Sequence, residues 1–156
     1  MATAPIPTCP EILASACQHM ASLKGHVVDV VDIAKPPDLD YAIHLAKVIS
    51  KLSPIMGNMI EYKTCGELNG HTGTTYGTWK RQDPDFPDAL FVGCIAPAPG
   101  IEIKAWYPLS TEITARFKES QAMLSAGNTN VVMLAWVPEH VLYGKPRIIG
   151  VFVATA

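Results

Sequence analysis

Two residues capable of metal binding and acid–base chemistry stand close together in the second half of the chain. Glu102 and Lys104 are separated by one residue within the apolar run Gly100–Tyr107, so on a β-strand their side chains share one face. The residues between and beside them are apolar and would face a core, where charges are costly unless they are paired or bind a metal. The pattern predicts either a functional site or a solvated ion pair between these two side chains.

A second carboxylate is expected at the same place. Asp88 follows Pro87 and begins the apolar run Asp88–Ile95, which a proline-rich turn joins to Gly100–Tyr107. If the two runs pair as a hairpin, Asp88 and Glu102 reach the same point in space. Mg²⁺ prefers carboxylate oxygens and keeps several waters, one of which can act as a nucleophile. A lysine can orient that water or offset transition-state charge, so the set suits a magnesium-dependent phosphodiesterase.

The spacing of acid and lysine is a weak signal when taken alone. It occurs twice, at Glu61-Tyr-Lys63 and at Glu102-Ile-Lys104, and the first lies in a helical context where residues two apart occupy different faces. Only the second lies in a predicted strand after a Pro-Asp pair. Asp83 and Asp85 crowd Asp88, and either could be the metal-binding aspartate. We favour Asp88 because it begins the apolar strand, whereas the other two lie in a proline-broken turn.

Hydrophobic periodicity and chain breakers predict the helices before these strands. A loose lead-in, Met1–Pro10, should precede a short helix over Glu11–Lys24, with Ile12, Leu13, Ala16 and Leu23 on its apolar side. Asp38 is a plausible N-cap for a second helix that reaches Leu52. Ser53-Pro54 looks like the start of another helix that ends near Gly66, because proline is favoured in the first turn. The stretch Gly66–Gly77 reads as a loop or as a turn-rich strand pair.

The second half alternates strands with one helix. Ser110 can cap a helix running to about Ala126, and Asn130–Val137 and Arg147–Ala154 are two further apolar strands. This order predicts an α/β domain with a mixed sheet of about five strands flanked by helices. Trp106 and Trp136 lie in predicted strands and are expected in the core.

Pro87-Asp88 followed by Glu102-Ile-Lys104 in the next strand resembles the PD-(D/E)XK nuclease superfamily, particularly the type II restriction endonucleases. Their core is a helix, a three-stranded meander, a helix and a further strand. The resemblance implies a restriction-endonuclease-like domain over residues 38–156, preceded by a lead-in and short helix over residues 1–37. The chain ends on an apolar strand at Ala156, which allows for a domain truncated at its C-terminus.

The resemblance also implies an activity and its residues. Asp88 and Glu102 would hold Mg²⁺, or Mn²⁺ in its place, together with the Ile103 carbonyl and Glu61 from the preceding helix. Lys104 would position the water that hydrolyses a phosphodiester bond of double-stranded DNA. A symmetric DNA site would favour a homodimer, and a restriction enzyme would act beside a cognate methyltransferase. The alternatives are a repair or recombination nuclease of the same fold, and a catalytically inactive DNA-binding or assembly domain.

Polar groups near the predicted site are candidates for DNA contacts. The helix after the Lys104 strand and the segment beside Trp79 supply hydroxyl, amide and cationic groups that suit phosphates and base edges. A solvated surface is the competing interpretation. The candidates are Thr111, Thr114, Arg116, Lys118, Gln121, Lys80 and Arg81.

Composition limits the remaining classes of protein. With 12 Lys and Arg against 14 Asp and Glu, the formal net charge is −2, which excludes a basic nucleic-acid coat protein. An apolar content of 49% excludes a chain that is mainly disordered. No apolar run approaches the roughly 20 residues of a membrane-spanning helix. The four cysteines form no CxxC pair, which favours reduced thiols in the cytoplasm and argues against a zinc ribbon. A nucleophilic pair of Cys65 with His71 or His140 has only residue identity in its support.

Overall fold

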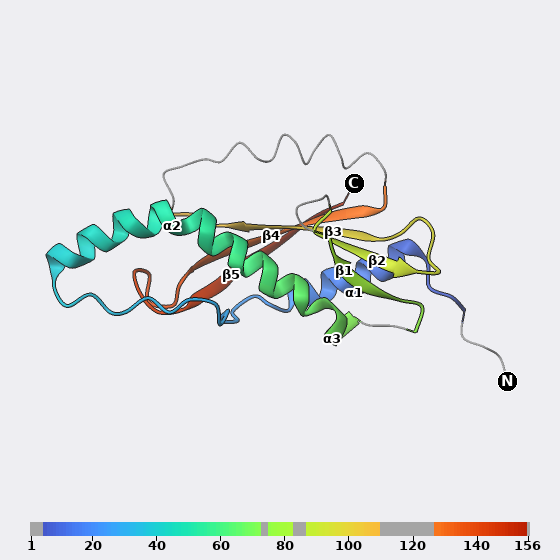
Figure 1. Cartoon of the computed structure of the whole chain (residues 1–156), viewed down its shortest axis with the longest axis horizontal. Coiled ribbons are helices and arrows are strands. Elements are labelled where there is room, and N and C mark those ends of the chain that lie inside the picture. Colours follow the sequence, from blue (N-terminus) through green and yellow to red (C-terminus); the bar gives the residue numbers. More distant parts are fainter. Residues whose placement is uncertain (1–4, 73–74, 83–86, 110–126, 156) are drawn as a thin grey trace.

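The computed structural model describes residues 5–72, 75–82, 87–109 and 127–155. Its described part is an α/β arrangement with a mixed five-stranded sheet in the order β1-β2-β3-β4-β5, which confirms the predicted fold class. Neighbouring strands are antiparallel except for β3 and β4, which are parallel. In Figure 1, α2 runs as one long helix across the front of the sheet. The elements are α1 (Cys9–Ala21), α2 (Leu39–Gly66), α3 (Leu68–Thr72), β1 (Gly77–Arg81), β2 (Ala89–Gly93), β3 (Gly100–Trp106), β4 (Thr129–Pro138) and β5 (Pro146–Thr155).

The first helix begins two residues earlier than the apolar pattern predicts. Thr8 is its N-cap: the Thr8 hydroxyl accepts from the Glu11 amide and the Glu11 carboxylate accepts from the Thr8 amide. This capping box satisfies two amides that the first helical turn leaves without partners, so the helix can start at Cys9. The lead-in predicted over residues 1–10 therefore ends at Thr8, two residues earlier than predicted. The predicted apolar side is confirmed, since Ile12, Leu13, Ala16 and Leu23 are all buried.

The prediction of two helices between residues 38 and 66 is wrong, because α2 continues through Pro54. A proline inside a helix has no N–H to donate to the carbonyl four residues earlier, which here is that of Ser50. The Ser53 hydroxyl donates to this Ser50 carbonyl over 2.8 Å and supplies a replacement bond. Burial of Ser53, Met56 and Gly57 then keeps the helix continuous across the proline.

Both long helices cover the same face of the sheet. The Asn130 amide on β4 donates to the Cys17 sulfur of α1 over 3.3 Å. On α2, a methyl group at Gly57 would lie 3.5 Å from the Ala105 Cβ on β3, so helix and strand approach closely there. Ile101 pairs with Asn130 in the β3–β4 register, so their side chains lie on the same face of the sheet. Ala105 is four residues after Ile101 on β3 and lies on that face too, so α1 and α2 contact the same face. The fully buried residues of this layer include Ile101, Ile103, Val132, Leu134, Trp136 and Ile148.

The tryptophans divide between core and surface. Trp136 is fully buried and stacks on Tyr107 with ring centroids 4.9 Å apart, as expected. Trp106 is 45% exposed, so its predicted place in the core is wrong, because it lies on the sheet face opposite the helices. Trp79 is buried on β1 and packs edge to face against Phe91.

The glycine-rich stretch forms neither of the two structures predicted for it. Its described part contains the short helix α3, and β1 begins at Gly77. Asn69 of α3 binds the Trp79 backbone twice, with its amide nitrogen donating to the carbonyl and its oxygen accepting from the N–H, both over 2.7 Å. These two hydrogen bonds fix the edge strand β1 to α3, which directly follows α2.

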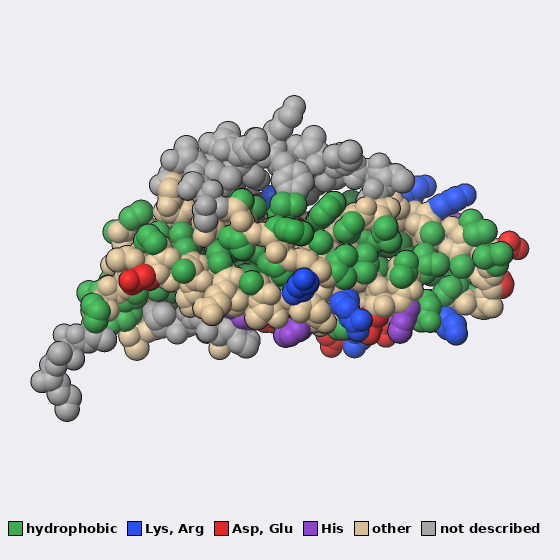
Figure 2. Space-filling view, turned by 180° about the vertical axis from the view of Figure 1, so that it is seen from behind, with side chains coloured by type: hydrophobic (Ala, Val, Ile, Leu, Met, Phe, Trp, Pro, Cys, Tyr) green, Lys and Arg blue, Asp and Glu red, His purple; other side chains and the backbone are tan. Residues whose placement is uncertain are grey.

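The molecule keeps many large hydrophobic side chains at its surface. Figure 2 shows them as a broad band across the side of the molecule that faces away in Figure 1. Within the described residues, no helix combines the length and apolar character that a membrane crossing requires.

Candidate active site

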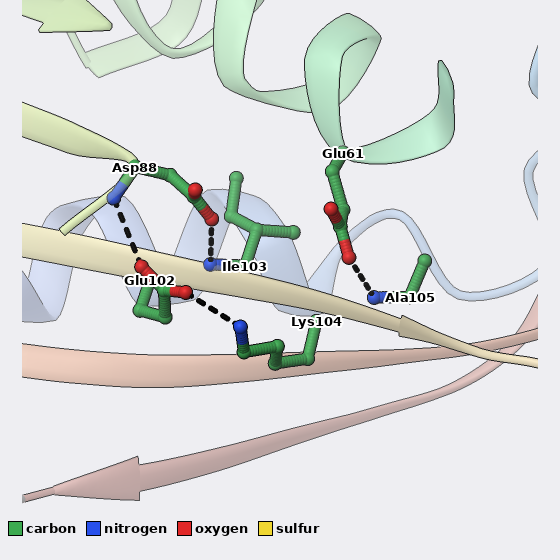
Figure 3. Close-up of polar contacts among 6 residues, drawn as sticks. All are labelled: Glu61, Asp88, Glu102, Ile103, Lys104 and Ala105. Carbon is green, nitrogen blue, oxygen red and sulfur yellow. Dashed lines mark hydrogen bonds and ion pairs between the residues drawn. The ribbon is translucent and has the colours of Figure 1, made fainter. Parts of the chain in front are cut away.

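The four side chains predicted to carry chemistry come together at one edge of β3 (Figure 3). Asp88 immediately precedes β2, Glu102 and Lys104 lie on β3, and Glu61 reaches the strand from α2. The predicted hairpin of β2 and β3 is present and pairs Ala89 with Ile101. The hairpin is what brings Asp88 beside Glu102 although fourteen positions separate them.

The carboxylates of Asp88 and Glu61 take the place of a strand partner along this edge. β2 pairs with β3 at two positions, and in the part of the chain that the structure describes no strand pairs with the β3 backbone beyond them on that side. The Ile103 N–H donates to the Asp88 Oδ2 over 2.7 Å, and the Ala105 N–H donates to the Glu61 Oε1 over 2.9 Å. Both carboxylates thus satisfy backbone groups whose burial without a partner would be costly.

Glu102 is engaged at both of its oxygens. Its Oε1 lies 2.7 Å from the Lys104 Nζ, and its Oε2 accepts the Asp88 N–H over 3.0 Å. The side chains of Glu102 and Lys104 are 7% and 23% exposed, so this is a mostly buried ion pair and not the solvated bridge considered above as the alternative. A buried pair is costly to break from one side only, because the remaining charge loses its compensation.

The environment of Glu61 favours its protonated form. Burial raises the pKa of the Glu61 carboxyl to about 7, and the negative charges of Asp88 and Glu102 add to the increase. The Ala105 amide and the Lys104 ammonium act in the opposite direction. A carboxyl with this pKa is poised to exchange a proton near neutral pH, which is common at functional sites.

Carboxylates are the ligand type that divalent cations prefer, but the carboxylates of this site are engaged in hydrogen bonds and an ion pair. Among the described residues, no three or more His, Cys, Asp or Glu side chains are placed so that they could hold a metal ion. The repulsion that Asp88 and Glu102 exert on Glu61 is nevertheless what a cation would relieve. A cation placed here would compete with Lys104 for the Glu102 carboxylate.

A cavity of about 580 Å³ adjoins the site between α2 and the start of β2. Glu61 and Asp88 contribute to its wall, as do Arg81 and Tyr62. The Arg81 guanidinium lies 3.8 Å from the Tyr62 ring centroid, a cation–π contact that holds the cation beside the carboxylates. Sequence reasoning selected Arg81 but missed Tyr62, and only its position next to Glu61 could have indicated it.

The other candidate residues are more scattered. Lys80 is exposed on β1, and its neighbour Arg81 points to the other face of the strand. Cys65 is buried and its sulfur approaches the Asp88 carbonyl at 4.0 Å, whereas His140 packs on Tyr143 in the β4–β5 turn. Other predicted positions lie outside the described residues: Asp83, Asp85, Thr111, Thr114, Arg116, Lys118 and Gln121.

No protein-family model matches the chain, and no curated protein sequence matches it significantly.

Proposed function

We propose that this protein is a Mg²⁺-dependent DNA endonuclease of the PD-(D/E)XK type, and specifically a restriction enzyme. One observation supports this most directly: three carboxylates from three separate elements and one lysine gather on the open edge of β3. The pairing of Pro87-Asp88 with Glu102-Ile-Lys104 supplies the residues that such chemistry needs. The mixed five-stranded sheet is compatible with that fold.

Each residue has a distinct role in this proposal. Asp88 and Glu102 hold the cation, with help from the Ile103 carbonyl and Glu61. The bound cation would supply an activated water and neutralise charge on the phosphate. Lys104, once Glu102 has turned away, directs its ammonium to the attacking water or to the phosphate oxygen. Glu61, with its raised pKa, can hold or release a proton beside these groups.

Double-stranded DNA is the proposed substrate, cut by a homodimer at a symmetric site. Arg81 offers a cation for a phosphate next to Glu61 and Asp88. A restriction enzyme would have a methyltransferase of the same specificity as its functional partner. The four free cysteines suit a reducing cytoplasm.

The decisive experiment is plasmid cleavage in Mg²⁺ or Mn²⁺ by the wild-type protein and by the Glu102→Gln and Lys104→Ala variants. Asp29→Ala is the matched control, because Asp29 and Lys145 form a 2.9 Å carboxylate–lysine pair away from the site. Wild-type and control proteins should cut, and both site variants should lose activity. Cleavage that survives in both site variants would refute the assignment. Discrete bands indicate a restriction enzyme, whereas cuts confined to junctions or flaps indicate a repair or recombination nuclease.

A second candidate function is a catalytically inactive binding or assembly domain. The observation in its favour is that Glu102 and Lys104 pair with each other while Asp88 and Glu61 bind backbone amides. Calorimetric titration with Mn²⁺ separates the two candidates. Mn²⁺ binding by the wild type that is lost in Asp88→Asn supports the nuclease. If neither the wild type nor Asp88→Asn binds Mn²⁺, the inactive domain is supported.

A further inference from the structure

The helix α2 carries an apolar stripe that is mostly exposed, although Leu45 within it also packs against the core. Seven apolar residues follow one another at alternating steps of four and three, which gives the 3.5-residue period of helices that pair along a seam. We call this set the α2 stripe; it comprises Tyr41, Leu45, Val48, Leu52, Ile55, Met59 and Tyr62.

The stripe is distinct from the face that α2 turns to the core. The core face is formed by residues such as Ile49, Met56 and Ile60, which are at most 4% exposed. Five of the seven stripe residues are at least 37% exposed, and Ile55 and Tyr62 reach 60% and 62%. Exposed polar residues, among them Lys47 and Lys51, occupy the third side of the helix. The stripe therefore lies between the buried and the solvated sides.

We propose that a second copy of this chain packs on the α2 stripe through its own α2 stripe, forming a two-fold homodimer. A self-complementary surface is what a two-fold interface requires, and a seam of this period lets side chains of one helix fit between those of another. Tyrosines at both ends of the stripe can bury their rings while their hydroxyls reach water.

The area of the stripe is consistent with a stable pair. The exposed parts of its side chains amount to on the order of 500 Å² per copy, and flanking residues add to this. The smaller specific interfaces bury roughly 600 Å² per partner, so the stripe supplies most of the area that such a pair needs. An apolar patch of on the order of 500 Å² is among the largest found on single proteins, and such patches are often functional.

Pairing through α2 would also affect the cavity beside the candidate active site. Ile55, Met59 and Tyr62 belong both to the stripe and to the cavity wall. A second copy would therefore border that cavity, and Glu61 of each copy would lie on the paired helices. The proposal itself depends only on the stripe and holds whether or not the protein cleaves DNA.

Light scattering coupled to size-exclusion chromatography tests the proposal on the full chain at tens of micromolar. We expect twice the mass of one chain for the wild type and a monomer for Leu52→Glu and Ile55→Glu, with dissociation constants raised at least about tenfold. Both side chains are 43% or more exposed in a single copy, so the variants should fold, as circular dichroism can verify. Leu39→Glu is the matched control, since Leu39 is 74% exposed on α2 but outside the stripe, and this variant should remain dimeric.

A monomeric wild type would overturn the proposal, as would a dimer that persists in both glutamate variants, because its interface would then lie elsewhere.

Discussion

The Asp88 carboxylate and the Ile103 amide form a 2.7 Å hydrogen bond across the gap where β2 and β3 separate. The same carboxylate that is proposed to bind a cation therefore also completes the hydrogen bonding of the sheet edge. Structural and catalytic roles of Asp88 can be separated by choosing substitutions that keep or remove its acceptor oxygen.

Asp88→Ala should destabilise the protein more than Asp88→Asn does. The asparagine retains an oxygen that can accept from the Ile103 N–H, whereas alanine leaves this amide without its acceptor, at a cost of about 1–2 kcal/mol. Urea denaturation measures the difference, and both variants should lose metal binding and cleavage. Equal stabilities of the two variants would show that the bond contributes nothing to the fold.

The stability of the protein should depend on the ionisation of Glu61. The pKa of this carboxyl is about 7 in the folded state against 4.5 in its ordinary environment. Between these two pH values the folded chain keeps a proton on Glu61 that the unfolded chain has released. The contribution of Glu61 to the free energy of unfolding is therefore fully present below pH 4.5 and is lost as the pH rises to 7. Glu61→Gln removes this dependence and keeps an acceptor for the Ala105 N–H.

The comparison of wild type with Glu61→Gln isolates this effect from other titrating groups. The free energy of unfolding of the wild type should fall relative to that of the variant by on the order of 2 kcal/mol between pH 5 and pH 8. Denaturant unfolding at several pH values gives both curves. Parallel curves would contradict the assignment of the raised pKa to Glu61.

Breaking the Glu102–Lys104 pair from one side should be costly. Lys104→Met leaves the buried Glu102 carboxylate without its cation and should reduce stability by roughly 3 kcal/mol. The double variant Glu102→Gln/Lys104→Met removes both charges and should recover much of that loss. A thermal or urea unfolding cycle measures the coupling, and additive losses would argue against a buried pair. Lys145→Ala, which breaks the exposed pair with Asp29, should have little effect.

The continuity of α2 should depend on Ser53 only because Pro54 follows it. Ser53→Ala removes the hydroxyl that donates to the Ser50 carbonyl and should cost about 1 kcal/mol. Pro54→Ala restores the backbone N–H, so in that background the Ser53 substitution should cost much less. Unfolding of the four proteins in this cycle measures the coupling, and an equal cost in both backgrounds would contradict the replacement bond.

Local patterns predicted most of the secondary structure around the site. Alternating and apolar runs identified β2, β3, β4 and β5 because strand formation here follows from side chains that must be buried. Two helix boundaries were predicted wrongly because a side chain makes a hydrogen bond that the backbone would otherwise lack. The Thr8 hydroxyl accepts from the Glu11 N–H, so α1 begins earlier, and the Ser53 hydroxyl donates to the Ser50 carbonyl, so α2 continues past Pro54. Trp106 was misplaced because its aromatic type was given more weight than the two-residue period, which puts it on the face of Glu102 and Lys104 and away from the core.

The sequence by itself determined that a strand directly follows Asp88 and that Glu102 and Lys104 share one face of the next. These facts follow from chain order and the two-residue period of a strand. Only the tertiary structure decided that β2 leaves β3 after two pairs, and that Asp88 and Glu61 fill the opened edge. The Glu61–Ala105 bond joins residues 44 positions apart, so it depends on how α2 packs against β3. The raised pKa of Glu61 has the same origin, since burial and neighbouring charges exist only once the distant elements have met.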